Sequence, residues 1–539
     1  MLKTQGFILF CITLAVVVAV ASEKRYSGYK VYTVKKARND TQYKALLELQ
    51  KKFKKVDFWS DPSKRRPTDI MVSPEDLPQT EQFLSSHGLE YSVAINDVQR
   101  VVEKEKQRAT RQSSMNWRDY QRLRTIHDWL DSLAAFNPQI AQVDTIGRST
   151  EGRNLKIIKL SKNPEKKNPV IYIDGGIHAR EWISPAVTTY IIGKLMSLSP
   201  QDKDLLENVD WHIIPVLNPD GYEYTFNEDR LWRKSRSLHN GPNCPGVDLN
   251  RNFDFHWGEA GTNDDPCRNT YPGPFPFSEP EANHTASYLF NNRNRIRAYL
   301  TFHSYSQLWL TPYGYTEDLP SDYEELENLG LRAAKALADV YGTEYEVGAP
   351  SHILYSNSGS SRDYAKGVPG IKYSYTIELR DQGDFGFLLP PQQILSTCEE
   401  TWEGVKVIAR QVARERPNGP TFSDIYNLYS GSSQDWAREY GNVKYSYTIE
   451  LRDDGEEKFL LSPEYILPTC EETWEAVKVV ARYLVTNQLT TYSESNYSKP
   501  PPFPTAPTVI KKDEDEENSD VNENNESDSS EEDDDEDDD

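Results

Sequence analysis

Long apolar runs are scarce in this sequence, and beyond residue 21 none is long enough to cross a membrane. No stripe of basic residues is present, which argues against a nucleic-acid partner. Cysteine is also rare, with five in 539 residues. Membrane spanning and nucleic-acid binding are therefore not expected. The hydrophobic share of 37% and the aromatic share of 11% suffice for a globular enzyme with more than one core.

The one long apolar run lies at the amino terminus. It extends from Phe7 to Val18, follows Lys3, and precedes Ala19-Val20-Ala21, a small-x-small cleavage site. The run is too short for a membrane span and no stop-transfer charges follow it, so we predict a secretory signal peptide over residues 1–21. The mature protein is then secreted into an extracellular space, where cysteines can pair.

Most of the formal charge of −23 lies at the carboxyl terminus. Residues 513–539 contain eighteen Asp and Glu and no Lys or Arg, and without them the charge is −5. Such a segment cannot bury enough apolar surface to fold. We expect residues 488–539 to be a disordered acidic tail, with weak binding of Ca²⁺ or of a basic partner as the alternative by composition.

Two potential metal ligands lie between a predicted strand and a predicted helix. Val170–Ile173 is a brief apolar run, which two glycines end, and it predicts a strand. Ser184-Pro185 then offers an N-cap and a first-turn proline to a helix over Val187–Met196. His178 and Glu181 thus follow the carboxyl end of a buried strand, where ligands bind in open α/β sheets. Both residue types bind Zn²⁺, although this short motif alone is weak evidence.

Further motifs that belong with His178 and Glu181 occur later in the sequence. A second buried strand over residues 296–302 ends at His303. The other motifs are Leu231-Trp232-Arg233-Lys234, Val247-Asp248-Leu249-Asn250-Arg251-Asn252 and the run from Lys372 to Asp381, which contains Glu378. Over roughly residues 26–487 this ordered set resembles the zinc metallocarboxypeptidases of the pancreatic A/B type.

The resemblance implies two folded parts. Residues 22–111 match the family's activation peptide, and their alternating strand and helix patterns predict a small α+β domain. Arg108 and Arg111 are candidate cleavage points for an activating trypsin-like protease; a permanent accessory domain is the alternative to a removable plug. Residues 112–416 match the catalytic domain, whose pattern predicts an α/β fold with a mixed central sheet. The family adds eight strands with helices on both faces.

The resemblance also assigns the chemistry. The implied ligands of one Zn²⁺ are His178, Glu181 and His303. The metal's fourth position would carry a water whose pKa falls into the neutral range. Glu378 matches the general base, which takes the water's proton and passes it to the leaving amine. Arg233 matches the residue that stabilises the oxyanion. The alternatives are a salt bridge between Glu378 and Arg380, and a basic surface turn around Arg233.

An exopeptidase also has to recognise the free carboxylate of a peptide or protein C-terminus. In the family's pattern Arg251 grips that group bidentately, Asn250 adds a hydrogen bond, and Tyr355 closes over the bound residue. The residues that match subsites on the amino side are Arg180, Ser304, Tyr305 and Phe387. This arrangement implies that single C-terminal residues are released.

Arg362 occupies the family's selectivity position. The other matching pocket positions are Leu310, Gly314, Asn357 and Thr376. Family members that prefer aromatic or aliphatic residues carry an apolar residue at this position, and those that prefer Lys or Arg carry aspartate. A guanidinium in a partly shielded pocket favours a terminal Glu or Asp. An arginine turned out to solvent beside an A-type pocket is the alternative.

A tandem duplication departs from the family. Residues 358–410 recur as residues 430–482 at a constant offset of 72, including the shared runs Lys-Tyr-Ser-Tyr-Thr-Ile-Glu-Leu-Arg-Asp and Cys-Glu-Glu-Thr-Trp-Glu. We therefore predict that residues 417–487 duplicate the last part of the catalytic domain. A solenoid would need several stacking units.

Only one copy can complete the active site. The first copy has Tyr355 and Arg362, whereas the second has Asn427 and Gln434 at the equivalent positions. We therefore assign Glu378, not Glu450, as the base. If the second copy docked instead, the acidic preference would vanish, and a peptide-binding homologue with an impaired site is the competing hypothesis.

The cysteines divide in the same way. Cys244 and Cys267 match the family's disulfide. Cys398 and Cys470 are equivalent positions of the two copies, so two separate thiols are as consistent with the sequence as a bridge.

Overall fold

A computed structural model describes residues 23–53, 56–109, 114–239, 241–414, 449, 451 and 466–486. The chain divides into two units, residues 1–428 and 429–539. Several predictions fall outside the described residues: the signal peptide, the acidic tail, Arg111, Asn427, Gln434 and Glu450. Within the described part, no helix is long and apolar enough to span a membrane.

Residues 23–109, the N-terminal domain, form a four-stranded antiparallel sheet in the order β2-β3-β1-β4. The elements are β1 (Lys30–Val34), α1 (Asp40–Lys52), β2 (Asp57–Phe58), β3 (Thr68–Val72), α2 (Leu77–Ser86), β4 (Tyr91–Ile95) and α3 (Val98–Ala109). Apolar side chains of α1, including Leu46 and Leu49, pack with Ile70 and Val72 of β3 into a separate core. The predicted α+β fold of this part is confirmed.

Residues 114–414, the main domain, are built on an eight-stranded mixed sheet in the order β11-β10-β12-β9-β7-β8-β6-β5. Its strands are β5 (Ala141–Arg148), β6 (Asn154–Leu160), β7 (Val170–Gly175), β8 (Asp210–Ile214), β9 (Ile296–Ser304), β10 (Leu308–Leu310), β11 (Glu346–Gly348) and β12 (Tyr373–Leu379). The four central strands are parallel. Being buried on both faces, they are almost continuously apolar, as the sequence suggested.

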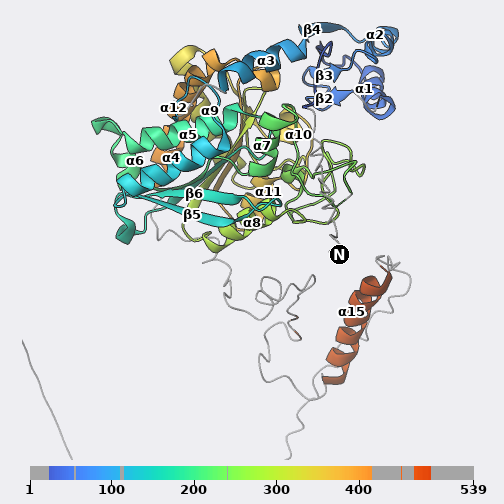
Figure 1. The fold of residues 1–539 in the computed structure, drawn as a ribbon. Helices are drawn as coiled ribbons and strands as arrows, with labels where there is room; N and C mark the ends of the chain where they lie inside the picture. Colours follow the sequence, from blue (N-terminus) through green and yellow to red (C-terminus); the bar gives the residue numbers. More distant parts are fainter. Residues whose placement is uncertain are drawn as a thin grey trace, which may run out of the picture. The chain divides into compact units, whose positions relative to one another are not determined.

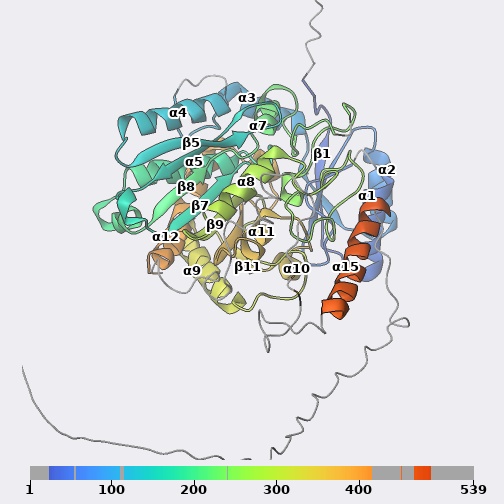
Figure 2. The ribbon, with the colours of Figure 1, turned by 90° about the horizontal axis from the view of Figure 1, so that it is seen from below.

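Helices cover both faces of this sheet (Figure 1). They are α4 (Leu123–Phe136), α5 (Ile183–Met196), α6 (Asp204–Glu207), α7 (Pro219–Asn227), α8 (Pro280–Asn291), α9 (Tyr323–Tyr341), α10 (Pro350–Ile353), α11 (Ser361–Gly367) and α12 (Ile394–Arg414). Alternate residues of β7 enter two cores: Ile171 and Ile173 pack with α4, α5, α9 and α12, whereas Val170 and Tyr172 pack with α8 and α11. Figure 2 shows α8 and α11 on this second face. The predicted α/β fold is confirmed.

Neighbouring parallel strands in the middle of the sheet bring the predicted site residues together at their carboxyl ends. Glu378 of β12 is directly beside His303 of β9, and Phe302 of β9 is beside Gly175, the last residue of β7. Backbone pairing therefore fixes the spacing between the predicted base and a predicted metal ligand.

The first copy of the duplicated segment closes the main domain. Helix α12 buries Val405 and Ile408, and a Cβ added at Gly404 would lie only 3.1 Å from the carbonyl oxygen of Ala333. The equivalent helix of the second copy, α15 (Ile466–Thr486), belongs to the other unit and carries Ala476 at the position of Gly404. Trp474 of α15 is 61% exposed, whereas its counterpart Trp402 is 5% exposed. The first copy thus fits the tight contact that a glycine permits.

Candidate metal centre and active site

Three buried side chains converge at the carboxyl ends of β7 and β9. Potential ligand atoms of His178, Glu181 and His303 all lie within 4.8 Å of one another. His178 Nδ1 is 2.8 Å from Glu181 Oε1 and 3.1 Å from His303 Nδ1, and His303 Nδ1 is 3.2 Å from Glu181 Oε2. Two histidines and a carboxylate are a usual ligand set of catalytic zinc, which leaves a further position open.

Outer hydrogen bonds determine which ring nitrogens face the centre. His178 Nε2 donates to Asp248 Oδ1 at 3.1 Å, and His303 Nε2 donates to the Thr301 hydroxyl at 3.2 Å. The Thr301 hydroxyl in turn donates to Asp174 Oδ1 at 2.6 Å. Both Nδ1 atoms therefore present lone pairs to each other and to the Glu181 carboxylate, an arrangement that repels unless a cation lies between them. The residues present fit a divalent metal.

The surrounding charges are arranged around Asp248. Its Oδ2 accepts from Arg233 Nε at 3.2 Å and from Arg233 Nη2 at 2.9 Å. Although burial favours the neutral acid, Arg233 and His178 hold the pKa of Asp248 well below its usual range. One carboxylate thus orients both a metal ligand and the predicted oxyanion-stabilising arginine.

Glu378 lines the same cavity as the predicted ligands. Burial, and then the charge of Glu181, raise the pKa of Glu378 well above its ordinary value. The alternative ion pair with Arg380 is absent from the described residues, because Arg380 Nε donates to Glu400 at 2.7 Å instead. Arg380 therefore does not hold the Glu378 carboxylate.

Most of the predicted substrate-binding residues line this cavity, whereas Arg180 and Gly314 do not. Its lining includes Asn250, Arg251, Ser304, Tyr305, Tyr355, Arg362, Phe387, Leu310, Asn357 and Thr376. The Asn250 side chain accepts from the amide of Ser361 at 2.9 Å, and Arg251 Nε donates to the carbonyl of Gly261 at 3.0 Å. Both side chains are thereby held in place beside the predicted ligands.

Arg362 is buried, which excludes the alternative that it turns to solvent. Its side chain is 3% exposed, and Nη2 lies 2.8 Å from Asp363 Oδ1. Nη1 reaches the Thr376 hydroxyl at 3.4 Å, and a Cβ added at Gly314 would lie 2.5 Å from Nη2. The guanidinium thus lies at the wall of the pocket, with part of its charge balanced by Asp363.

The N-terminal domain covers the amino side of the cavity. Trp59 packs on Phe387 with ring centroids 5.2 Å apart. Arg180 Nη1 donates to Asp57 Oδ2 at 3.2 Å, and the Tyr305 hydroxyl donates to Asp69 at 2.6 Å. Only about 70 Å³ of free space is left in the cavity. A peptide cannot enter while this domain is in place.

Arg180 therefore contacts the N-terminal domain. It is 1% exposed, and its guanidinium lies 3.9 Å from the centre of the Phe387 ring. Cys244 and Cys267 form the expected disulfide, with a Cα–Cα distance of 4.6 Å. Cys398 and Cys470 are separate thiols, the first buried and the second exposed.

The predicted N-cap of α5 was wrong. The helix begins at Ile183, and no side chain caps it. The Ser184 hydroxyl instead accepts from the amide of Gly176 at 2.9 Å and donates to the carbonyl of Phe302 at 2.5 Å. Ser184 therefore ties the helix to the metal-binding turn and to β9, because these buried backbone groups need partners.

Sequence reasoning gave no role to Asp248, Thr301 or Asp174. Asp248 lies in the motif that contains Asn250 and Arg251. An acidic residue so close to these two was the signal that could have identified it. Thr301 precedes His303 by two residues in one strand, so both side chains are on the same face. Asp174, 0% exposed, is an acid inside an apolar strand.

Comparisons with known proteins agree with this geometry. The family described as zinc carboxypeptidase matches residues 126–404 and again residues 405–476, and the carboxypeptidase activation peptide family matches residues 35–105. The chain belongs to the zinc carboxypeptidase family. It is accordingly a zinc metallocarboxypeptidase with an activation propeptide, and His178, Glu181 and His303 are its zinc ligands.

This chain covers nearly the whole length of several relatives. Carboxypeptidase B of Astacus astacus is 50% identical over 299 residues, 55% of this chain and 98% of that protein. Carboxypeptidase B of Rattus norvegicus is 41% identical over 413 residues, 75% of this chain and 99% of that protein. The crystal structure of carboxypeptidase A from Helicoverpa armigera shares 34% identity at a TM-score of 0.67, covering 72% of this chain and 98% of that one.

Proposed function

We propose that this zymogen is a secreted carboxypeptidase that releases single C-terminal residues, preferably Glu or Asp, with Glu378 as the general base. The observation that carries the proposal is the direct pairing of Glu378 with His303 on neighbouring strands, inside a cavity that also contains Arg251. A base, a metal ligand and a group that binds carboxylates are then within reach of one peptide end.

The chain's own residues supply most of the chemistry. When bound, Zn²⁺ supplies a Lewis acid that activates water and polarises the scissile carbonyl. Glu378 accepts the proton of the attacking water and delivers it to the leaving amine. Arg233, fixed by two hydrogen bonds to Asp248, balances the charge that develops on the carbonyl oxygen.

Arg251 and Asn250 make the enzyme an exopeptidase. Arg251 lines the cavity, and its guanidinium can pair with a terminal carboxylate through two parallel hydrogen bonds. Asn250 adds a hydrogen bond and Tyr355 covers the bound residue. Arg180, Ser304, Tyr305 and Phe387 then contact residues on the amino side of the scissile bond.

Arg362 supports the acidic preference. Its guanidinium lines the pocket and Asp363 balances only one of its edges, so Nη1 can meet a substrate carboxylate. A basic side chain would face a like charge there. The alternative is A-type specificity, in which Asp363 neutralises Arg362 and an apolar side chain occupies the remaining space.

Activation requires removal of the N-terminal domain. A trypsin-like protease acting at Arg108 or Arg111 would separate it from the main domain. The apolar run before Ala21 supports export of the chain, and a disulfide between Cys244 and Cys267 suits an oxidising compartment.

The test is to treat the full chain with trypsin and offer peptides that end in Glu, Phe or Lys. We expect cleavage of the Glu-terminated peptide, its loss with a chelator, and its recovery with Zn²⁺. Arg362→Ile should lower kcat/KM for the Glu-terminated peptide about tenfold or more. A tenfold loss corresponds to about 1.4 kcal/mol of transition-state stabilisation. A preference for Phe that Arg362→Ile leaves unchanged would refute the acidic specificity.

The duplicated segment provides a matched control for the base. Glu378→Gln should lower kcat by a factor of about 10² to 10⁴, the usual contribution of general base catalysis. Glu450→Gln makes the same substitution in the second copy and should leave kcat unchanged. The reverse result would assign the base to the second copy, and no activity in any form of the protein would favour a peptide-binding homologue.

A further inference from the structure

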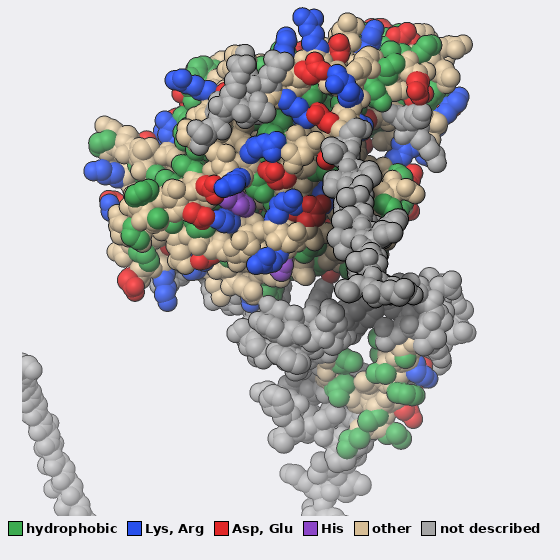
Figure 3. Space-filling model, viewed as in Figure 1, with side chains coloured by type: hydrophobic (Ala, Val, Ile, Leu, Met, Phe, Trp, Pro, Cys, Tyr) green, Lys and Arg blue, Asp and Glu red, His purple; other side chains and the backbone are tan. Residues whose placement is uncertain are grey.

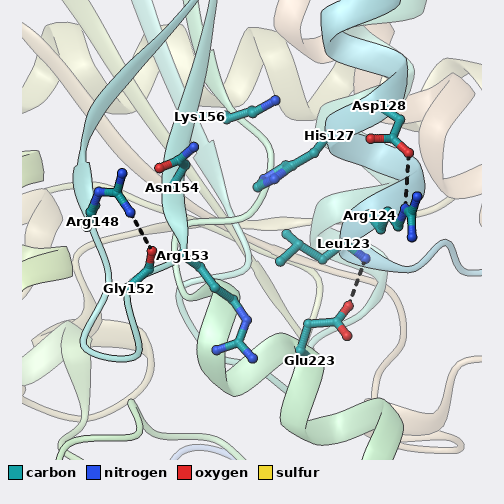
Figure 4. A pocket seen from close by; sticks show the side chains of 10 residues that line it. All are labelled: Leu123, Arg124, His127, Asp128, Arg148, Gly152, Arg153, Asn154, Lys156 and Glu223. Atoms are coloured by element: carbon teal, nitrogen blue, oxygen red, sulfur yellow. Dashed lines mark hydrogen bonds and ion pairs between the residues drawn. The ribbon is translucent and has the colours of Figure 1, made fainter.

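A second cavity lies at the other end of the main sheet. It has a volume of about 530 Å³, opens widely to solvent, and is lined by residues of α4, α7 and the hairpin of β5 and β6 (Figure 4). Strands β5 and β6 are at the opposite edge of the sheet from β10 and β11. The two cavities share no lining residue, so this one is separate from the zinc site.

Cations outnumber anions around this cavity. Arg124, Arg148, Arg153 and Lys156 line it, against Asp128 and Glu223. Figure 3 shows the face over α4, β5 and β6, where basic and acidic side chains are mixed. The excess of positive charge is confined to the lining, because Glu151, Asp220 and Asp131, which do not line the cavity, pair with Arg153 and Lys156.

The two acids are already engaged. Asp128 lies 3.5 Å from Arg124 on the same helix, and Glu223 accepts from the amide of Leu123 at 3.2 Å. Neither is free to hold a cationic ligand. Arg124, Arg153 and Lys156 are paired as well, so Arg148 is the lining cation that no carboxylate of the described residues holds, and it favours an anion.

Several polar groups face the cavity without a strong protein partner. Among the described residues, the His127 ring and the Asn154 amide make no side-chain hydrogen bond, and Arg148 bonds only to the carbonyl of Gly152 at 3.3 Å. In Figure 4 the ends of Asn154, Lys156 and His127 surround the same open space, and no dashed line crosses it. Burial lowers the pKa of His127 to about 4, so its neutral ring can donate one hydrogen bond.

Two of the cations are held in position by carboxylates that do not line the cavity. Arg153 Nη1 donates to Asp220 Oδ1 at 2.7 Å, and that carboxylate is completely buried. Lys156 pairs with Asp131 at 2.5 Å, outside the cavity lining. Fixed cations bind an anion with less loss of conformational entropy than mobile ones.

We propose that this cavity binds a ligand carrying several sulfate or phosphate groups. Arginine forks and a lysine suit the oxygens of such groups. The volume is within the range of about 300–1,000 Å³ typical of small-molecule sites, and cations on more than one side of the cavity favour a ligand with more than one anionic group.

The proposal is tested by calorimetric titration of the uncleaved full chain with inorganic sulfate, inorganic phosphate, tripolyphosphate and sucrose octasulfate. We expect saturable one-to-one binding of at least one of the two polyanions, weakening as salt is added. Comparing tripolyphosphate with sucrose octasulfate distinguishes a phosphate ligand from a sulfate ligand. No saturable binding of either polyanion would refute the site.

Variants separate this cavity from general surface charge. Arg148→Gln with Lys156→Gln should weaken binding at least tenfold, whereas Lys335→Gln, which removes an exposed cation of α9, should not change it. Equal effects of the double and control variants would overturn the proposal. Should the double variant unfold, the His127 ring resonance of the unmodified chain provides the answer: it should shift on titration, and an unchanged resonance would contradict binding here.

Discussion

The buried ion pair of Glu105 and Arg230 predicts how firmly the N-terminal domain is held. Glu105 belongs to α3, Arg230 follows α7, and their side chains are 3% and 1% exposed. Arg230 Nε donates to Glu105 Oε2 at 2.8 Å. Glu105→Ala leaves the guanidinium buried without its carboxylate whenever α3 is docked. Breaking a buried pair in this way costs about 3–5 kcal/mol.

Other contacts of Arg230 place the expected cost at the lower end. Its guanidinium keeps hydrogen bonds to the carbonyls of Arg180 and Phe387, and it lies 3.6 Å from the Trp182 ring centre. We therefore expect about 3 kcal/mol, which at roughly 1.4 kcal/mol for each factor of ten is about a hundredfold shift toward undocked α3.

Hydrogen exchange of the α3 amides in the uncleaved protein measures this shift. Exchange should accelerate about a hundredfold in Glu105→Ala. Glu103→Ala is the control, because Glu103 lies on the same helix and pairs with Arg25 at the same 2.8 Å, but in an exposed position. An exposed pair contributes about 0–1 kcal/mol. Equal exchange rates in the two variants would refute the reasoning.

Three further predictions follow from buried contacts. Thr301→Val should weaken zinc binding about 10- to 100-fold, because His303 loses the hydroxyl that its Nε2 contacts. Thr301→Ser keeps a hydroxyl and should restore the affinity, measured in competition with a chromogenic chelator. Equal affinities of all three forms would contradict this role. His212 has a pKa lowered to about 3 by burial and then by Lys159 and Arg295, and it accepts from the Tyr288 hydroxyl at 2.9 Å. Because the unfolded chain takes up this proton near pH 6.5 and the folded chain does not, His212 should reduce the free energy of unfolding by up to roughly 1.4 kcal/mol per pH unit as the pH falls below about 6.5. Urea unfolding at several pH values should show a shallower decline in His212→Gln, and identical slopes would exclude this source. Gly404→Ala should lower the free energy of unfolding by about 1–3 kcal/mol through overpacking against Ala333, whereas an unchanged urea midpoint would show that α12 can shift.

Local patterns were sufficient to predict much of the fold. The alternating strand and helix patterns of residues 22–111 predicted a small α+β domain, which β1 to β4 form together with α1 and α2. The buried parallel strands β7 and β9 were recognisable from their apolar runs. His178 and Glu181 follow the end of β7 and His303 lies near the end of β9, where ligands bind in α/β sheets, but their assignment as zinc ligands came from the family resemblance.

Contacts between distant segments were beyond such patterns. Ser184 fitted an N-cap, but its hydroxyl bonds to the carbonyl of Phe302, 118 residues away. Asp57 pairs with Arg180, 123 residues away, and this contact could not be predicted from the local sequence around either residue. Such contacts depend on how whole elements pack, which local spacing does not specify.

The adjacency of Glu378 and His303 in one ladder constrains how this enzyme can change. Strands lie about 4.7–4.9 Å apart wherever they pair, so the distance from the proposed proton acceptor to the metal ligand is set by the backbone and not by loops. Natural variation or engineering can therefore redesign the wall around Arg362 for a new terminal residue while the reactive spacing stays constant. A slip of one residue between these strands would turn every side chain to the other face and abolish catalysis at once.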